Sequence, residues 1–143
     1  MQTEKALVKG LTLRGKAATN NNKDFSVDIP QGKLILDDCD MTYDSLSCIA
    51  IHGETANPSI RNCQIHDGKQ SGVYVHNKGQ GTVENCEIFA NTYSQIDIKK
   101  YCKIQVIQSK VNGKIVNKSS SRKNIIFVGI ISIILILILL TLL

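Results

Sequence analysis

The feature that most constrains this chain is a repeat of about 23 residues in its middle third. Residues 57–76 and 80–99 align at one constant offset, and each stretch holds two short runs in which β-branched and polar residues alternate. The matched positions include Ile60 with Val83, Asn62 with Asn85, Cys63 with Cys86 and Ile65 with Ile88. A single unit of this kind has no partner for its backbone groups or its apolar face. It must therefore stack on copies of itself.

The same pattern continues on both sides of the central pair. Upstream, Cys39 precedes Cys63 at nearly the same interval, and Leu11 precedes Cys39 at a slightly longer one. Downstream, Ser109 keeps the offset from Cys86, but no second apolar run follows at that spacing. The units lack the Leu frame of leucine-rich repeats and any segment of helical period. The sequence therefore predicts an all-β parallel β-helix of about four to five coils over residues 4–112.

The segment Asn57-Pro-Ser-Ile-Arg-Asn-Cys-Gln-Ile-His-Asp-Gly-Lys-Gln-Ser-Gly-Val-Tyr-Val75 resembles the right-handed β-helix repeats of the pectin-lyase-like superfamily. In particular, it is similar to the repeats of F-box-only proteins and of bacterial β-helix proteins. The resemblance implies a right-handed coil and a role in recognising another protein, although the chain has no counterpart of the F-box. Carbohydrate lyases and hydrolases of the superfamily use clustered carboxylates beside a catalytic Arg or Lys. The outward columns here offer no such set, so no catalytic residue is assigned.

Three of the five cysteines, Cys39, Cys63 and Cys86, fall on one interior position of the repeat. Packed, reduced thiols are favoured there over a metal site, because the chain has no Cys-x-x-Cys pair. Disulfides remain the other alternative. Cys102 lies outside this column, beside Lys100 and Lys103, and is expected to be accessible and to react faster than the other three. We expect no metal and no cofactor.

Strand parity predicts which side chains face outward. One column runs Asp37, Arg61, Glu84; a second places Tyr74 beneath Asp97, and a third places His52 beneath His76. Two stacked imidazoles could share a metal ion or a phosphate, but without a third ligand a solvated face is the simpler interpretation. The candidate binding surface therefore consists of Arg61, Glu84, Tyr74, Asp97, His52 and His76.

Residues 124–143 carry no charge and are almost entirely apolar. As a helix they would extend about 30 Å, the thickness of a bilayer's hydrocarbon core. A narrow β-helix cannot surround a helix that is apolar on every side, so a transmembrane α-helix is predicted. Residues 113–123 form a basic linker to it, with Lys114, Lys118, Arg122 and Lys123 near the membrane. Basic residues mark the cytosolic side of a span, and the polar segment Met1–Lys5 lacks the apolar region of a signal peptide.

The net charge of +5 is unevenly distributed. Residues 1–97 hold 9 Lys/Arg and 12 Asp/Glu (9 − 12 = −3), whereas residues 98–123 hold 8 Lys/Arg and no acid. This basicity belongs to the approach to the membrane, and no nucleic-acid partner is expected. We predict a single-pass protein with a C-terminal anchor and a cytosolic, non-catalytic β-helix that binds a protein or glycan, and that self-associates through exposed coil ends. The alternatives are a degenerate carbohydrate-active enzyme or a fragment of a longer repeat protein.

Overall fold

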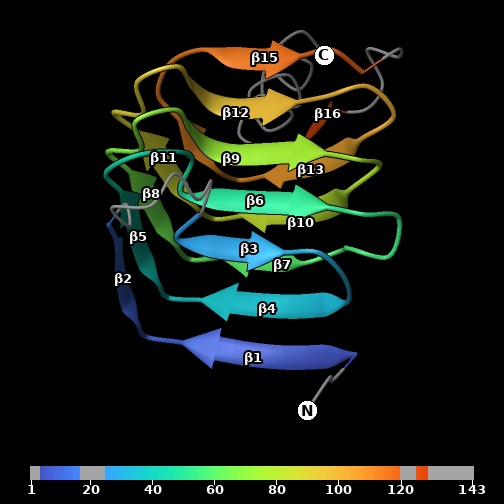
Figure 1. Cartoon of the computed structure of the whole chain (residues 1–143), viewed down its shortest axis with the longest axis horizontal. Helices are drawn as coiled ribbons and strands as arrows, with labels where there is room; N and C mark the ends of the chain where they lie inside the picture. The colour runs from blue at the N-terminus through green and yellow to red at the C-terminus, as the bar shows by residue number, and fades with distance from the viewer. Residues whose placement is uncertain (1–3, 17–24, 120–124, 129–143) are drawn as a thin grey trace, which may run out of the picture.

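The computed structural model describes residues 4–16, 25–119 and 125–128, the last four by their backbone alone. Within these residues the chain forms sixteen strands and no helix. The strands wind into a parallel β-helix whose coils lie one above another, with β1 at one end and β15 at the other (Figure 1). The prediction of an all-β, parallel β-helix is therefore confirmed.

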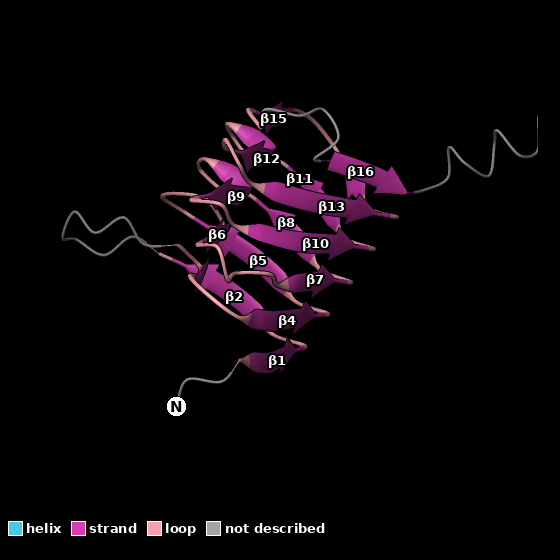
Figure 2. Cartoon of the chain, turned by 90° about the vertical axis from the view of Figure 1, so that its right-hand side faces the viewer, coloured by secondary structure: helices cyan, strands magenta, loops and turns pink. Residues whose placement is uncertain are grey.

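Each coil contributes one strand to each of three parallel sheets, which form the three sides of the β-helix. Sheet A contains β1 (Lys5–Lys9), β4 (Lys33–Asp37), β7 (Ser59–Arg61), β10 (Gln80–Glu84), β13 (Lys103–Ile107) and β16 (Ile125–Val128). Sheet B contains β2 (Thr12–Gly15), β5 (Asp40–Tyr43), β8 (Gln64–His66), β11 (Glu87–Phe89) and β14 (Lys110–Val111). Sheet C contains β3 (Val27–Ile29), β6 (Ile49–His52), β9 (Ser71–His76), β12 (Ser94–Ile98) and β15 (Ile115–Asn117). Five coils are complete, and β16 begins a sixth beside β13 (Figure 2).

The turn from sheet A to sheet B uses one left-handed residue in every coil. The φ angles there are 55° at Asp38, 54° at Asn62, 49° at Asn85 and 44° at Gln108, and Gly10 has 68°. Asn and Asp tolerate this conformation better than most residues with a side chain. The Asn85 amide donates to Asn62 Oδ1 (2.7 Å), and the Asn62 amide donates to Asp37 Oδ1 (2.8 Å). The turn thus sets the corner of each coil and ties it to the next.

The core is a set of interior columns that run along the axis of the β-helix. In sheet A, Leu36, Ile60 and Val83 stack in register, and in sheet C, Ile49, Val73 and Ile96 do the same. These side chains are at most 1% exposed. Each such aliphatic side chain stabilises the fold by roughly 1.5–3 kcal/mol through burial. The stacking of like side chains on like explains why the sequence repeats.

The cysteine column lies at the entrance to sheet B and is buried. The Cys39 N–H donates to Cys63 Sγ (3.4 Å), and the Cys63 N–H donates to Cys86 Sγ (3.5 Å). At the last position the Cys86 N–H donates to Ser109 Oγ instead (3.0 Å). All five cysteines of the chain are free thiols. The column side chains therefore fill interior space, and those of Cys63 and Cys86 also accept a backbone N–H that follows the left-handed turn.

The expectation that Cys102 is accessible is wrong, because this residue is 0% exposed. The preceding residue, Tyr101, has a left-handed φ of 63°, and the Cys102 N–H bonds to the Lys99 carbonyl (3.3 Å). This tight turn directs the Cys102 thiol into the interior, although Lys100 and Lys103 near it in the chain are exposed. Burial raises the pKa of Cys102.

The expectation that the last coil lacks its final apolar run is also wrong. Strand β15 supplies that run and pairs with β12, with Ile115 opposite Ile96. The interval between these two residues is shorter than the regular period, because the turn between sheets B and C is shorter in this coil. Strand β15 therefore occupies residues that the sequence pattern had assigned to the linker.

Little of the predicted membrane segment falls within the described residues. Its residues 125–128 form β16, which pairs with β13 in parallel rather than making a helical turn. Residues 120–124 and 129–143 lie outside the described part of the chain. Among the residues that are described, no helix is long and apolar enough to cross a membrane. The transmembrane helix stays a prediction.

The first testable prediction concerns thiol reactivity. We expect all five cysteines to resist alkylation by iodoacetamide in the folded chain, because each is buried and burial raises the pKa of Cys48 to about 12. Mass spectrometry after timed labelling measures the rates. Lys100→Cys is the matched control, because Lys100 is exposed and lies close to Cys102 in the chain. The control should label orders of magnitude faster than any native thiol. Equal rates at the introduced thiol and at Cys102 would contradict the structure.

Candidate binding surface

Aromatic and imidazole side chains gather on the outer face of sheet C. Strands β6, β9 and β12 bring Ala50, Tyr74 and Asp97 into one column. They also place His52 directly beneath His76. The Lys99 N–H bonds to the Val75 carbonyl (2.9 Å), which continues the ladder and sets Lys99 above His76. The sequence therefore assigned these outward columns in the correct register.

Four rings form a continuous stack on this face, which we call the aromatic row: Phe25, Tyr74, His76 and His52. The His52 and His76 rings are 4.8 Å apart at an interplanar angle of 11°. Tyr74 lies 4.7 Å from His76, and Phe25 lies 6.3 Å from Tyr74. The side chains in the row are partly exposed. Partly exposed, mutually braced rings offer a flat contact surface that loses little conformational entropy on binding.

Charged groups border the aromatic row at both ends. Asp28 Oδ1 lies 2.9 Å from His52 Nε2. At the other end, Lys99 Nζ lies 5.5 Å from the centre of the Tyr74 ring and 3.0 Å from Asp97 Oδ2. The Asp97 side chain is only 5% exposed, although it belongs to the outward column. Its Oδ1 is buried without a hydrogen-bond partner among the described residues.

The row's protonation state follows from its packing. Burial, and after it the neighbouring charge of His52, lowers the pKa of His76. His76 is therefore neutral at pH 7 and packs as an aromatic ring. The hydrogen bond from Lys99 to Asp97 raises the pKa of Lys99. The face thus presents stacked rings between the Asp28 carboxylate at one end and the Lys99 ammonium at the other, an arrangement suited to binding.

The other two predicted site residues, Arg61 and Glu84, lie on sheet A. Arg61 is opposite Glu84 on one side and Asp37 on the other. Arg61 Nη2 is 3.2 Å from Asp37 Oδ2, and Lys9 Nζ is 3.7 Å from the same oxygen. The hydrogen bond from Asn62, and after it that from Arg61, lowers the pKa of Asp37. This column joins neighbouring coils and is separated from the aromatic row by the body of the β-helix.

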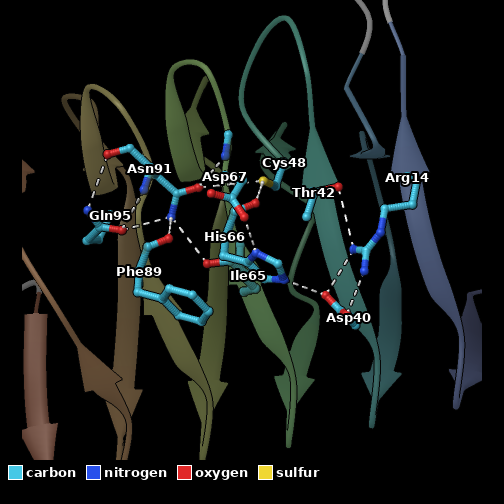
Figure 3. A network of polar contacts seen from close by, with 11 residues as sticks. Arg14, Asp40, Thr42, Cys48, Ile65, His66, Asp67, Phe89, Asn91 and Gln95 are labelled. Carbon is cyan, nitrogen blue, oxygen red and sulfur yellow. Dashed lines mark hydrogen bonds and ion pairs between the residues drawn. The ribbon is translucent and has the colours of Figure 1, made fainter.

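Sheet B carries a polar cluster of its own, formed around Asp40 and shown in Figure 3. Arg14 binds both carboxylate oxygens of Asp40 (3.1 and 2.8 Å). His66 Nε2 contacts Asp40 Oδ1 (2.7 Å), and its Nδ1 contacts Asp67 Oδ2 (2.6 Å). Both ring nitrogens are thus engaged by carboxylates, which leaves neither available as a catalytic base. The cluster links coils 1, 2 and 3 through contacts between Arg14, Asp40 and His66.

The buried Asn91 side chain, in the turn between β11 and β12, links neighbouring coils (Figure 3). Its amide nitrogen donates to the Ile65 carbonyl (3.2 Å), the Phe89 carbonyl (3.0 Å) and Gln95 Oε1 (2.8 Å). Its oxygen accepts from the Gly68 N–H (2.8 Å). A buried amide that is satisfied on both ends has a structural role.

The sequence pattern missed two contributors to the sheet C surface, Phe25 and Asp28. It also did not predict the polar cluster of Arg14, Asp40 and His66 on sheet B. Asp28 could have been found, because it lies between Val27 and Ile29 on the first strand of sheet C and must face outward. Phe25 could not, because its approach to Tyr74 depends on the path of the loop before β3.

Of the predicted membrane-proximal residues, Lys114 and Lys118 are exposed, and Arg122 and Lys123 lie outside the described residues. Among the residues described, no group of three or more His, Cys, Asp or Glu side chains could hold a metal ion.

Three parallel sheets stacked in register, with ladders of like residues inside, define the chain as a β-solenoid of three-strand coils. The family model described as "Right handed beta helix region" matches residues 9–128, which is most of the chain. The protein therefore belongs to the right-handed β-helix family. No solved structure gives a significant match to this chain.

The second prediction concerns pH. The pKa of His76 is lower in the folded chain than its ordinary value of 6.5. Between about pH 6.5 and the folded pKa, the unfolded chain binds more protons, so the free energy of unfolding falls as the pH falls. His76→Phe should keep the ring stack and reduce this slope. Urea titrations at pH 5 to 8 measure it, with the exposed Lys69→Gln as control. An unchanged slope in His76→Phe would refute this assignment.

Proposed function

We propose that the protein is a non-catalytic binding module whose sheet C face contacts a protein or glycan partner. The single observation that carries this proposal is the aromatic row, because its partly exposed rings present an apolar contact surface on the outside of sheet C. Interface energy concentrates in aromatic and Arg side chains near the centre of a contact. Tyr74 is central here: it touches Phe25, His76 and Lys99. Arg61 and Glu84 serve a second, weaker contact on sheet A.

The membrane is the second part of the proposal. Residues 124–143 are uncharged and long enough to cross a bilayer as one helix, and the lysine-rich segment before them favours a cytosolic β-helix. If β16 is retained, only the segment 129–143 is left. As a helix it would extend about 22 Å, short of the roughly 30 Å hydrocarbon core. A full span therefore requires residues 125–128 to leave sheet A, or a local thinning of the bilayer.

A degenerate carbohydrate-active enzyme is the alternative, and Asp97 favours it. A buried carboxylate oxygen without a partner is costly unless a ligand supplies a hydrogen bond. Lys99 beside it would supply positive charge. However, Asp28 contacts His52 and Asp97 contacts Lys99, so the two carboxylates are not paired across one bond as glycosidases require.

The third prediction separates binding from catalysis. Tyr74→Ala should weaken the free energy of partner binding by about 1–2 kcal/mol. Proximity labelling from the full-length variant in cells should therefore no longer label the specific neighbouring proteins that the wild type labels. Thr82→Ala, an outward change on sheet A, should keep them. An enzyme would instead turn over a polysaccharide, with or without calcium, and lose that activity by orders of magnitude in Asp97→Asn. Such turnover would replace the binding proposal.

The fourth prediction tests the anchor. The full chain should stay in the membrane fraction after carbonate extraction, whereas Ile133→Arg with Leu137→Arg should release it. Each Arg at the centre of a span costs about 2.5–3.5 kcal/mol. Gln70→Arg with Gln80→Arg adds the same charge at exposed positions and should leave the fraction unchanged. Release of the wild type by carbonate would rule out a span.

A further inference from the structure

The lysines of the last complete coil surround the end of the β-helix. Residues 98–119 contain six lysines and no acidic residue, whereas residues 1–97 carry a net charge of −3 (9 Lys/Arg, 12 Asp/Glu). Lys99 is tied to Asp97 on the sheet C face. The remaining five are exposed, and we call them the lysine collar: Lys100, Lys103, Lys110, Lys114 and Lys118.

The collar has members on every side of the molecule. Lys103 begins β13 on sheet A, Lys110 begins β14 on sheet B, and Lys118 directly follows β15 on sheet C. Lys100 and Lys114 occupy the turns between sheets. These strands make up the last complete coil, which lies toward the end opposite to β1, and in sheet A β16 lies beyond β13 (Figures 1 and 2). The charge therefore encircles one end and does not form a stripe along one side.

Their side chains can reach the end of the molecule. Lys103 lies opposite Gln80, in the parity that alternates with the buried Gly81 and Ile104, and so faces outward. Lys110 Nζ contacts Glu87 on the preceding coil at 3.2 Å, and Lys114 Nζ lies 5.1 Å from the centre of the Tyr93 ring, so these two side chains must leave exposed contacts to reach past the end. A four-carbon stem spans more than the strand spacing of about 4.8 Å. Among the described residues, β14 and β15 are the last strands of sheets B and C, so ammonium groups beside them can extend past these strands.

The shape of the collar selects its partner. A linear polyanion or an acidic peptide on one side of the β-helix would meet only one or two of these lysines. A flat anionic surface perpendicular to the axis meets all of them together. We propose that the C-terminal end of the β-helix docks against a layer of anionic lipid headgroups, so that the axis along which the coils stack is perpendicular to the membrane. This proposal rests on the membrane attachment proposed above and adds the orientation and the lipid charge.

Lysines on edge strands also have a simpler explanation, because they prevent edge-to-edge pairing with other chains. That role predicts no dependence on lipid charge. The experiment therefore compares headgroups. Full-length protein is mixed with vesicles of phosphatidylcholine alone, or with 30 mol% phosphatidylserine. Binding is followed by flotation, and acetylation of each lysine by mass spectrometry.

We expect collar lysines to be acetylated roughly fivefold more slowly on phosphatidylserine vesicles than on phosphatidylcholine vesicles, and 0.5 M NaCl to abolish the difference. Lys5, Lys16 and Lys33, at the far end, should react equally on both. In Lys103→Gln/Lys110→Gln/Lys118→Gln, the remaining Lys100 and Lys114 should lose their protection. Lys5→Gln/Lys16→Gln/Lys33→Gln, with the same charge change, should keep it. Resistance of Cys102 to alkylation verifies that each variant is folded.

The outcomes separate this proposal from the anchor. Flotation with both kinds of vesicle, together with equal acetylation rates of the collar lysines on both, would support the membrane anchor and overturn the proposed docking of the collar on anionic headgroups. Flotation on phosphatidylserine vesicles alone would support the collar and overturn the anchor. Flotation on neither would overturn both. If a short duplex DNA protects the collar as well as phosphatidylserine does, the collar is a general polyanion site and the lipid assignment is overturned.

Discussion

The structure depends on parallel hydrogen bonding between coils. A short strand has no internal partner for its N–H and C=O groups, so each coil is satisfied only by the coils above and below it. Register then becomes the controlling variable, because a slip of one residue would turn every interior side chain outward. The left-handed corner residues and the cysteine column prevent that slip. They fix the residue at which the chain leaves sheet A and the N–H that enters sheet B.

This constraint explains which parts of the structure the sequence predicts well. Interior columns repeat because each side chain packs on its own counterpart, so Cys39, Cys63 and Cys86 identify the register without any structural information. Outward columns follow from parity alone, as with His52 beneath His76. Prediction fails where a turn changes length. Because the turn before Ile115 is short, β15 follows β12 at less than the regular period of the repeat. The repeat pattern therefore does not predict β15.

Burial of individual side chains is less predictable than register. Cys102 has charged neighbours and would pass for a surface residue, but one left-handed residue before it turns the thiol inward. Asp97 is outward by parity and yet nearly inaccessible, because its exposure depends on Lys99 and on the side chains around it. Phe25 reaches Tyr74 from a loop that no repeat describes. The candidate surface could be placed from sequence, but its chemistry required the structure.

The two ends of the β-helix face different physical problems. At the first coil, β1 leaves a sheet edge and two apolar side chains exposed, with Leu7 at 59% and Leu11 at 48%. At the last complete coil, β14 and β15 are the final described strands of sheets B and C and lie among exposed lysines, while β16 continues sheet A. A charged end resists pairing with another β-helix, whereas an apolar end favours it. Self-association, where it occurs, should therefore use the β1 end and leave the lysine end free.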